Sequence, residues 1–271
     1  MVGGNGAIGY RILRALRPPK AGASTGGVAY GLPYSVTLRN LLGPGWEDQV
    51  RGRTVVDFGC GNGRGSVELA QHGADRVIGI DIREDRLAMA RRLARTAGVQ
   101  ERCEFTSHAN ARADLAISID AFEHFDDPAG VLRSISGFMR PGGRLVISFG
   151  PTWYHPYGGH FFSIFPWSHL MFTEGAQIRW RSEFKKDGAK RFTEVEGGLN
   201  LMTIARFERL VVDSGLVTER LRLVPIRRLR WLHSRATREF TTALVECLLR
   251  KPEAGMPDNR GLSGRSAPLA Q

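Results

Sequence analysis

The sequence predicts an α/β fold with a doubly wound parallel sheet, and two stretches carry this prediction. Residues 54–66, Thr-Val-Val-Asp-Phe-Gly-Cys-Gly-Asn-Gly-Arg-Gly-Ser, run from apolar residues into closely spaced glycines. This pattern is typical of a buried strand that ends in a tight turn, and the residues that follow, 66–72, have the spacing of a helix. A second apolar stretch, residues 76–81, again ends in an acid and precedes a helical pattern. Strands that alternate with helices favour a parallel sheet.

The glycine-rich turn is predicted to be a ligand site. Glycines let the backbone approach a ligand closely, and the start of the next helix directs N–H groups at it. The dinucleotide pattern G-x-G-x-x-G does not fit, because the sixth position counted from Gly59 is Arg64. The pattern is Asp-x-Gly-x-Gly-x-Gly, and the carboxylate of Asp57 suits a ligand with a cationic amine and repels a pyrophosphate.

Residues 57–63 resemble motif I of the class I S-adenosylmethionine (SAM) methyltransferases, which implies that SAM is the cofactor. Asp81 ends the second strand at about the spacing expected for the acid that holds the ribose hydroxyls. The alternative role of Asp81 is to cap the helix that starts near Arg83. In methyltransferases of this kind the next residue, Ile82 here, packs on the adenine.

The resemblance extends over residues 50–150. A Glu-His pair, Glu123 and His124, follows the fourth predicted strand, and a Pro-Gly-Gly turn precedes the fifth. The resemblance implies a Rossmann-like sheet of seven strands, whose last two strands form an antiparallel hairpin at the sheet edge. We expect the other strands at 104–106, 114–120, 144–149, 216–225 and 241–249, and the other helices at 10–16, 36–42, 84–97, 128–139 and 203–214.

The sequence departs from the family pattern after the third strand. An acid near the adenine is usual there, but no carboxylate occurs between Glu104 and Asp114. His108 or Asn110 is expected to contact the adenine instead. The cofactor-binding residues implied by the resemblance are Asp57, Gly59, Cys60, Gly61, Gly63, Asp81, Ile82, His108 and Asp120.

A long aromatic segment follows the fifth predicted strand. Residues 145–173 contain no Asp, Glu, Lys or Arg and show neither helical nor strand periodicity. Because a long loop after this strand lies over the active-site edge of such a fold, we interpret residues 151–201 as an aromatic cap for the acceptor substrate. A structural flap that seals the sheet edge and a loop that dips into a membrane are the alternatives.

Histidines are the candidate catalytic bases, because a hydroxyl or amine acceptor must lose a proton. His124 is the first candidate, since the loop after strand four faces the methyl group in this family; a structural histidine that closes the loop is the alternative. His160 and His155 come next. No metal site is predicted, because His155, His160 and His169 lack the HExxH spacing and have no nearby acid except Glu174.

Composition limits the partners and the compartment. The 271 residues carry a formal net charge of +11, which favours an anionic partner. Three cysteines without a C-x-x-C pattern indicate a reduced, cytoplasmic protein. We see no signal peptide and no transmembrane run, so we expect a cytoplasmic protein, with association at an anionic membrane surface as an open alternative.

Three regions are expected along the chain. Residues 1–50 form a partly flexible lead-in, residues 51–251 form the methyltransferase domain, and residues 252–271 form a disordered tail rich in Pro, Gly, Ser and Arg. The lead-in contains a literal G-x-G-x-x-G at residues 4–9. No strand can precede it, so we expect a flexible terminus there.

We therefore predict a SAM-dependent methyltransferase that acts on a small-molecule, aromatic or lipid-like acceptor, with the acceptor atom (O, N or C) open. A non-catalytic SAM-fold binding protein and a nucleic-acid methyltransferase are the alternatives. The absence of an Asn/Asp-Pro-Pro-Tyr/Phe motif argues against nucleic acid.

Overall fold

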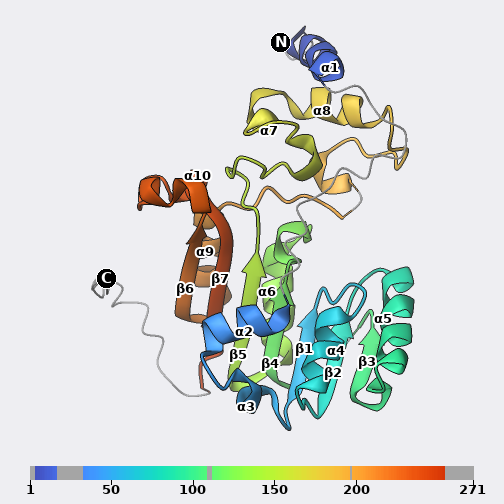
Figure 1. Ribbon diagram of the computed structural model, residues 1–271, viewed down its shortest axis with the longest axis vertical. Helices are drawn as coiled ribbons and strands as arrows, with labels where there is room; N and C mark the ends of the chain where they lie inside the picture. The colour runs from blue at the N-terminus through green and yellow to red at the C-terminus, as the bar shows by residue number, and fades with distance from the viewer. Residues whose placement is uncertain (1–3, 17–32, 109–111, 196, 254–271) are drawn as a thin grey trace.

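The computed structural model describes residues 4–16, 33–108, 112–195 and 197–253. Within them, seven strands form one sheet in the order β3-β2-β1-β4-β5-β7-β6 (Figure 1). The pairs among β1 to β5 are parallel, whereas β7 runs antiparallel to both β5 and β6. The bounds are β1 Thr54–Phe58, β2 Arg76–Ile80, β3 Cys103–Thr106, β4 Ala113–Ile119, β5 Met139–Phe149, β6 Val217–Pro225 and β7 Thr242–Arg250.

Helices cover both faces of the sheet. Four of them, α2 Tyr34–Leu42, α3 Trp46–Val50, α4 Arg64–Gln71 and α5 Glu84–Thr96, pack on one face, and α6 Pro128–Phe138 and α9 Ile204–Ser214 pack on the other. Successive side chains of a strand point to opposite faces, so Val55 joins the core under α2 and α4, while Val56 joins a cluster beside α6. The apolar runs of the central strands are explained by burial on both faces.

Side-chain caps fix where the two helices of the second face begin. The carboxylate of Asp127 accepts the Gly130 N–H at 2.9 Å, and Pro128 occupies the first turn of α6. The hydroxyl of Thr203 accepts the Arg206 N–H at 3.1 Å at the start of α9. That helix ends at Gly215, whose φ of 73° lies in the left-handed region.

The segment between β5 and α9, residues 150–203, lies beyond the carboxyl ends of the strands (Figure 1). We call it the β5–α9 segment. It contains η3 His160–Phe162, α7 Ser168–Met171, α8 Glu174–Arg181 and η4 Phe192–Glu194. Aromatic and aliphatic residues of the segment build a small core of its own, formed by Phe162, Ile178, Phe192, Val195 and Leu199, with Trp153 and Phe161 packed against it. A large part of the aromatic content is therefore used to fold the segment itself.

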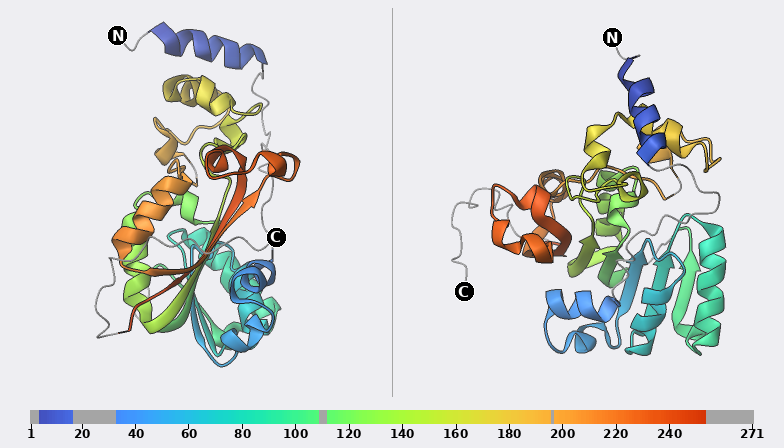
Figure 2. Two further views of the ribbon diagram at one scale, coloured as in Figure 1. Left: turned by 90° about the vertical axis from the view of Figure 1, so that its left-hand side faces the viewer. Right: turned by 45° about the horizontal axis from the view of Figure 1, so that its top comes forward.

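The N-terminal prediction is wrong in one respect. Gly4–Leu16 is a helix, α1, where the G-x-G-x-x-G run suggested a flexible terminus. It packs on α8 (Figure 2). Leu13 is fully buried against Ala176 and Trp180. A Cβ on Gly9 would already lie 3.3 Å from the Cβ of Ala176, so the glycine allows close helix contact.

The other predicted strands and helices match observed ones to within a few residues, except that β5 begins earlier, and the antiparallel edge hairpin is confirmed. The short helices α3 and α7 had no predicted counterpart. The connector between β6 and β7 contains η5 Arg227–Leu232 and α10 Arg238–Thr241. The turn expected at residues 140–143 lies within β5. Among the described residues, no helix has the length and apolar character needed to cross a bilayer. The expected disordered tail falls, from residue 254 on, outside the described residues.

Candidate cofactor and acceptor site

The glycine loop joins β1 to α4 at the carboxyl end of the sheet. Gly59, Gly61 and Gly63 have φ values of 82°, 53° and 79°, which favour glycine. A Cβ on Gly59 would lie 2.5 Å from the Cβ of Ala121, and one on Gly63 would lie 2.6 Å from the Cβ of Ala90. A Cβ on Gly61 would meet nothing within 4 Å. Two glycines therefore serve packing, and Gly61 faces open space.

Asp81 ties this loop to the end of β2. One carboxylate oxygen accepts the Gly61 N–H at 2.9 Å, and the other accepts the Arg83 N–H at 2.9 Å. Arg83 precedes α5, and no side-chain hydrogen bond caps that helix, so Asp81 holds the turn before the helix rather than capping it. The ribose role of Asp81 stays a prediction. Ile82 beside it is 93% exposed, as a residue that packs on a ligand would be.

Asp57 lies fully buried beneath the loop. Its carboxylate accepts hydrogen bonds from the Ser66 hydroxyl at 2.6 Å and from the Tyr34 hydroxyl at 3.0 Å. Burial raises the pKa of Asp57 to about 6, the two hydroxyl bonds oppose this shift, and the nearby Asp81 adds to it. Both oxygens already have protein partners, so the predicted contact with the methionine end stays a prediction.

Tyr34 was not identified from the sequence. It begins α2, and its ring occupies the space that a side chain on Gly65 would need. The carboxylate of Glu68 on α4 accepts the backbone N–H groups of Tyr34 and Ser35 at 3.0 and 2.8 Å. Because no motif marks this residue, only the docking of α2 on α4 reveals it.

The side chains of two predicted cofactor residues, Cys60 and His108, do not line the glycine loop in an obvious way. The Cys60 side chain packs into the core with Leu87 and Phe105, so this position can face a ligand only through its backbone. His108 is exposed, and its Nδ1 lies 2.8 Å from the Ser107 hydroxyl. Asn110 lies outside the described residues.

Asp120 ends β4 in a left-handed conformation, with φ of 53°. Such backbone strain in a residue other than glycine is concentrated at functional sites. Its N–H donates to the Ser148 carbonyl at 2.9 Å. Burial, followed by the negative charge of Glu123, raises the pKa of Asp120 to about 7.

The fold brings Glu123, His124 and His160 together. Each offers one ligand atom, and these three atoms all lie within 4.8 Å of one another. The imidazole rings of His124 and His160 meet edge to face, with centroids 5.3 Å apart. Sequence reasoning named both histidines singly, but their sequence separation gave no sign of this pairing.

Asn200 holds the loop that carries this group. Its side-chain amide donates to the carbonyls of Phe122 and Phe125 at 2.9 Å each, and its N–H donates to the Glu123 carbonyl at 3.1 Å. The end of the β5–α9 segment therefore positions the loop after β4. Asn200 was also missed, because a single asparagine in a polar stretch carries no pattern.

The other histidines of the segment serve its interior. His155 is buried, and its Nδ1 accepts the Tyr157 N–H at 3.0 Å. Burial, His169 and His160 together lower the pKa of His155 to about 4. His169 Nε2 donates to the Trp153 carbonyl at 2.7 Å, and its Nδ1 lies 2.8 Å from the Ser163 hydroxyl. A catalytic role for His155 stays a prediction.

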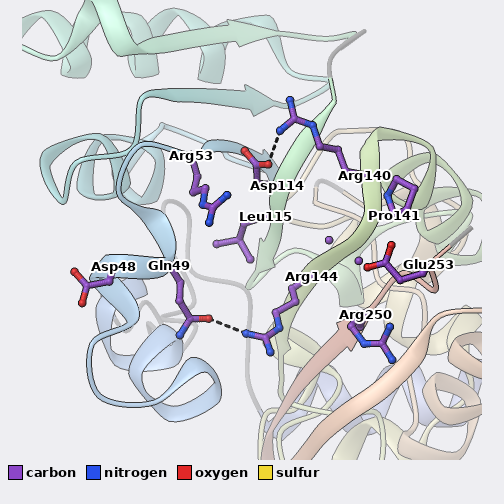
Figure 3. Close-up of a pocket in the computed structure, with 12 residues that line it drawn as sticks. Asp48, Gln49, Arg53, Asp114, Leu115, Arg140, Pro141, Arg144, Arg250 and Glu253 are labelled. Carbon is purple, nitrogen blue, oxygen red and sulfur yellow. Dashed lines mark hydrogen bonds and ion pairs between the residues drawn. The ribbon is translucent and has the colours of Figure 1, made fainter.

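A cavity of about 480 Å³ lies at the opposite, amino end of the strands (Figure 3). Four arginines line it, and three of them are paired with carboxylates: Arg140 pairs with Asp114 at 2.5 Å, and Arg144 and Arg250 pair with Glu219 at 2.9 and 3.0 Å. Ligands of doubly wound folds bind at the carboxyl ends of the strands, so this cavity is not the cofactor site.

Comparisons with known proteins agree with this geometry. Residues 56–147 match the family model described as a methyltransferase domain. The ubiquinone biosynthesis O-methyltransferase of Aeromonas salmonicida is 38% identical over 103 residues, which cover 36% of this chain and 43% of that protein. The enzyme of the same name from Stutzerimonas stutzeri is 34% identical over 118 residues, with coverages of 40% and 50%. The chain thus spans about half the length of these curated relatives.

A solved structure shows the same fold over most of the chain. Magnesium protoporphyrin IX methyltransferase from Synechocystis PCC 6803, crystallised with bound SAH, superposes with a TM-score of 0.53. The superposition covers 91% of this chain and 95% of that one, at 16% identity. The methyltransferase family that these comparisons match uses SAM as its cofactor. Together, these comparisons show that the chain contains a methyltransferase domain and that its seven-stranded sheet has the fold of the class I S-adenosylmethionine-dependent methyltransferases.

Proposed function

We propose that this protein is an enzyme that transfers the methyl group of SAM to a hydroxyl oxygen of a small acceptor. The observation that carries the proposal is that the glycine loop and the Glu123–His124–His160 group lie at neighbouring strand ends. The loop after β4 touches the loop after β1, since a Cβ on Gly59 would overlap Ala121. A cofactor on the first loop would therefore be adjacent to groups that can accept a proton.

The residues around the glycine loop fit the parts of SAM. The open face of Gly61 admits a ligand close to the backbone, the Asp81 carboxylate suits ribose hydroxyls, and exposed Ile82 suits an adenine ring. The buried carboxylate of Asp57 provides negative charge near a cationic amine. SAM supplies a methyl group that its sulfonium sulfur already activates. The chain must bind it, align an acceptor with it and exclude water.

Proton removal from the acceptor is assigned to the loop after β4. A backbone carbonyl can only accept, so the 3.0 Å contact between His124 Nδ1 and the Gly198 carbonyl fixes the proton on Nδ1. The Nε2 of a neutral His124 then has a free lone pair and can act as a base. His160 presents its ring beside it and is the second candidate.

The names of the relatives support oxygen as the acceptor atom, since those proteins are O-methyltransferases of ubiquinone biosynthesis. An aromatic or lipid-like alcohol or phenol is the acceptor class that we infer. The aromatic residues of the β5–α9 segment support an aromatic acceptor less strongly than the sequence suggested, because Phe162 and Phe192 pack inside the segment. Its role as an acceptor cap remains part of this proposal.

We also infer a peripheral contact with an anionic membrane on the cytoplasmic side. Trp231 and Leu232 of the connector between β6 and β7 are 77% and 41% exposed. Arg227, Arg228 and Arg230 around them are exposed as well. An exposed Trp among cations is typical of residues that sit at a membrane interface. The connector contacts the β5–α9 segment through Phe240 and Tyr154, whose rings lie 5.2 Å apart, so a lipid-like acceptor would enter near the site.

Calorimetric titration with SAM and with S-adenosylhomocysteine tests the cofactor assignment. Asp81→Ala is expected to weaken both ligands by roughly tenfold to a hundredfold, because hydrogen bonds to a charged group are lost. Asp85→Ala is the matched control, since Asp85 is exposed and pairs with Arg83 at 2.9 Å. Absence of binding by folded wild-type protein would refute the proposal, and equal loss in both variants would remove Asp81 from the site.

A further inference from the structure

The Glu123 carboxylate is buried, and one of its oxygens lacks a hydrogen-bond partner among the described residues. The side chain is 3% exposed. Its Oε1 accepts the Gly150 N–H at 3.2 Å, whereas Oε2 has no hydrogen-bond partner in the part of the chain that the structure describes. A buried carboxylate oxygen without a partner carries a large desolvation cost. Such an atom calls for an explanation, and a bound cation provides one.

Both neighbouring imidazoles are oriented as metal ligands usually are. His124 Nδ1 donates to the Gly198 carbonyl at 3.0 Å, and His160 Nδ1 donates to the Gly158 carbonyl at 3.2 Å. Histidine ligands commonly donate their other ring N–H to a carbonyl, which fixes the ring and the tautomer. Each ring therefore keeps the Nε2 lone pair for another partner.

The charge of the surroundings also suits a cation. A second carboxylate, that of Asp120, lies three residues before Glu123 at the end of β4. The two acids place negative charge beside the imidazoles, where it attracts a cation.

Strain in the backbone marks the same place. Asp120 and His160 both have φ of 53°, a conformation that residues other than glycine rarely adopt. The two residues come from different loops, one after β4 and one in the β5–α9 segment. Strain that converges on one point from separate segments is typical of a site held in place for a ligand.

We propose that Glu123, His124 and His160 bind one divalent transition-metal ion, of the Zn²⁺ type. Two imidazoles favour Zn²⁺ over Mn²⁺ and Mg²⁺, which prefer oxygen ligands. Bonds of about 2.0–2.2 Å to Zn²⁺ require the three side chains to rotate inward from their present separations. Three protein ligands leave a position open, as in catalytic rather than structural metal sites.

The chemical role of the ion rests on the proposed transfer to oxygen. The acceptor hydroxyl would occupy the open position, where the ion lowers its pKa and its proton leaves to water. The oxygen then forms a bond to the methyl carbon. The carbon–sulfur bond breaks, its electron pair stays on sulfur, and S-adenosylhomocysteine is released. When the ion is bound, the Nε2 atoms of His124 and His160 hold it, so water takes the proton that His124 would take in the metal-free protein.

Metal titration of the full chain, without a histidine tag and after treatment with a chelator, tests the site. Calorimetry with Zn²⁺, Mn²⁺ and Mg²⁺ measures affinity and stoichiometry, and the visible absorption of bound Co²⁺ reports imidazole coordination. We expect one ion per chain, with Zn²⁺ bound more tightly than Mg²⁺. Glu123→Gln and His160→Gln are expected to weaken Zn²⁺ by about tenfold or more.

Matched variants separate a built site from chance binding. Glu123→Gln keeps an oxygen for the Gly150 N–H and should fold, which circular dichroism checks. His72→Gln removes a histidine that follows the last residue of α4 and contacts Trp46 at the other end of the fold, and this variant should bind Zn²⁺ as wild type does. Absence of Zn²⁺ binding, or equal loss in all three variants, would overturn the proposed site.

A SAM titration of the metal-free protein keeps the two proposals apart. SAM binding without any Zn²⁺ binding would overturn the metal site and leave the methyltransferase proposal intact. Zn²⁺ binding that fails to respond to Glu123→Gln has the same consequence for the site. Zn²⁺ binding at Glu123 in a protein that never binds SAM would leave the metal site and remove its catalytic role.

Discussion

Three glycines of one loop serve two different purposes. Gly63 has a left-handed φ of 79° and no room for a Cβ beside Ala90, whereas Gly61, with φ of 53°, has open space. We expect Gly63→Ala to lower the free energy of unfolding by about 2–4 kcal/mol, through overpacking and backbone strain. Gly61→Ala should cost only about 1 kcal/mol but weaken SAM binding, because its methyl group would project into the open space.

Urea denaturation and SAM titration of both variants check this difference. Similar losses of stability in both would show that the space beside Gly61 has no special role. Unchanged SAM affinity in Gly61→Ala would place the cofactor elsewhere.

Asp57 makes stability depend on pH. Its pKa is about 6 in the folded state and 3.8 in the reference state. A raised pKa in the folded state means that the folded protein binds the proton more tightly, so this group lowers stability as pH rises through this window. Its neighbours Tyr34 and Cys60 stay neutral there, because burial raises the pKa of both, and Asp81 is the charged neighbour.

Asp57→Asn should remove that penalty. We expect the variant to gain up to roughly 3 kcal/mol relative to wild type at about pH 8, and little at about pH 4. Urea denaturation at both pH values measures the difference. Asp85→Asn is the exposed control, and a variant whose stability relative to wild type is independent of pH would contradict the assigned ionisation.

At the scale of elements, the docking of α1 is the feature that the sequence did not indicate. Leu13 is fully buried against α8, whereas the adjacent Ile12 is 44% exposed. We expect Leu13→Ala to weaken the α1–α8 contact by about 2–4 kcal/mol and Ile12→Ala to have little effect. Hydrogen exchange of α1 and α8 should accelerate in the first variant alone. Faster exchange throughout the sheet would mean that α1 supports the whole fold.

The element boundaries that the sequence predicted well have local causes. Gly215 ends α9 and Pro128 begins α6, each through the conformation of its own backbone. The sequence of the β5–α9 segment shows neither helical nor strand periodicity over residues 150–173. Its short helices form because the aromatic cluster around Phe162 and Phe192 packs them, and such contacts cannot be read from neighbouring residues.

At the scale of the whole molecule, the basic connector and the exposed Trp231 predict membrane binding. Trp231→Ala should reduce sedimentation with vesicles that contain phosphatidylglycerol, and added salt should reduce wild-type binding because it screens the arginines. Val212→Ala on α9, which removes a side chain that is 72% exposed, is the control. Equal binding to neutral and anionic vesicles would contradict the charge argument, and no binding to either would refute the membrane contact.

The sequence by itself determined the α/β class, the glycine loop after β1 and the order of most elements. These features follow from patterns within a few neighbouring residues: apolar runs, helical spacing, glycines and caps. Only the tertiary structure decided which distant residues meet. It placed Tyr34 on Asp57, Asn200 beneath the loop after β4, and His160 beside Glu123 and His124. Such contacts depend on how separate elements pack, because each element buries its apolar face against elements that are distant in the sequence.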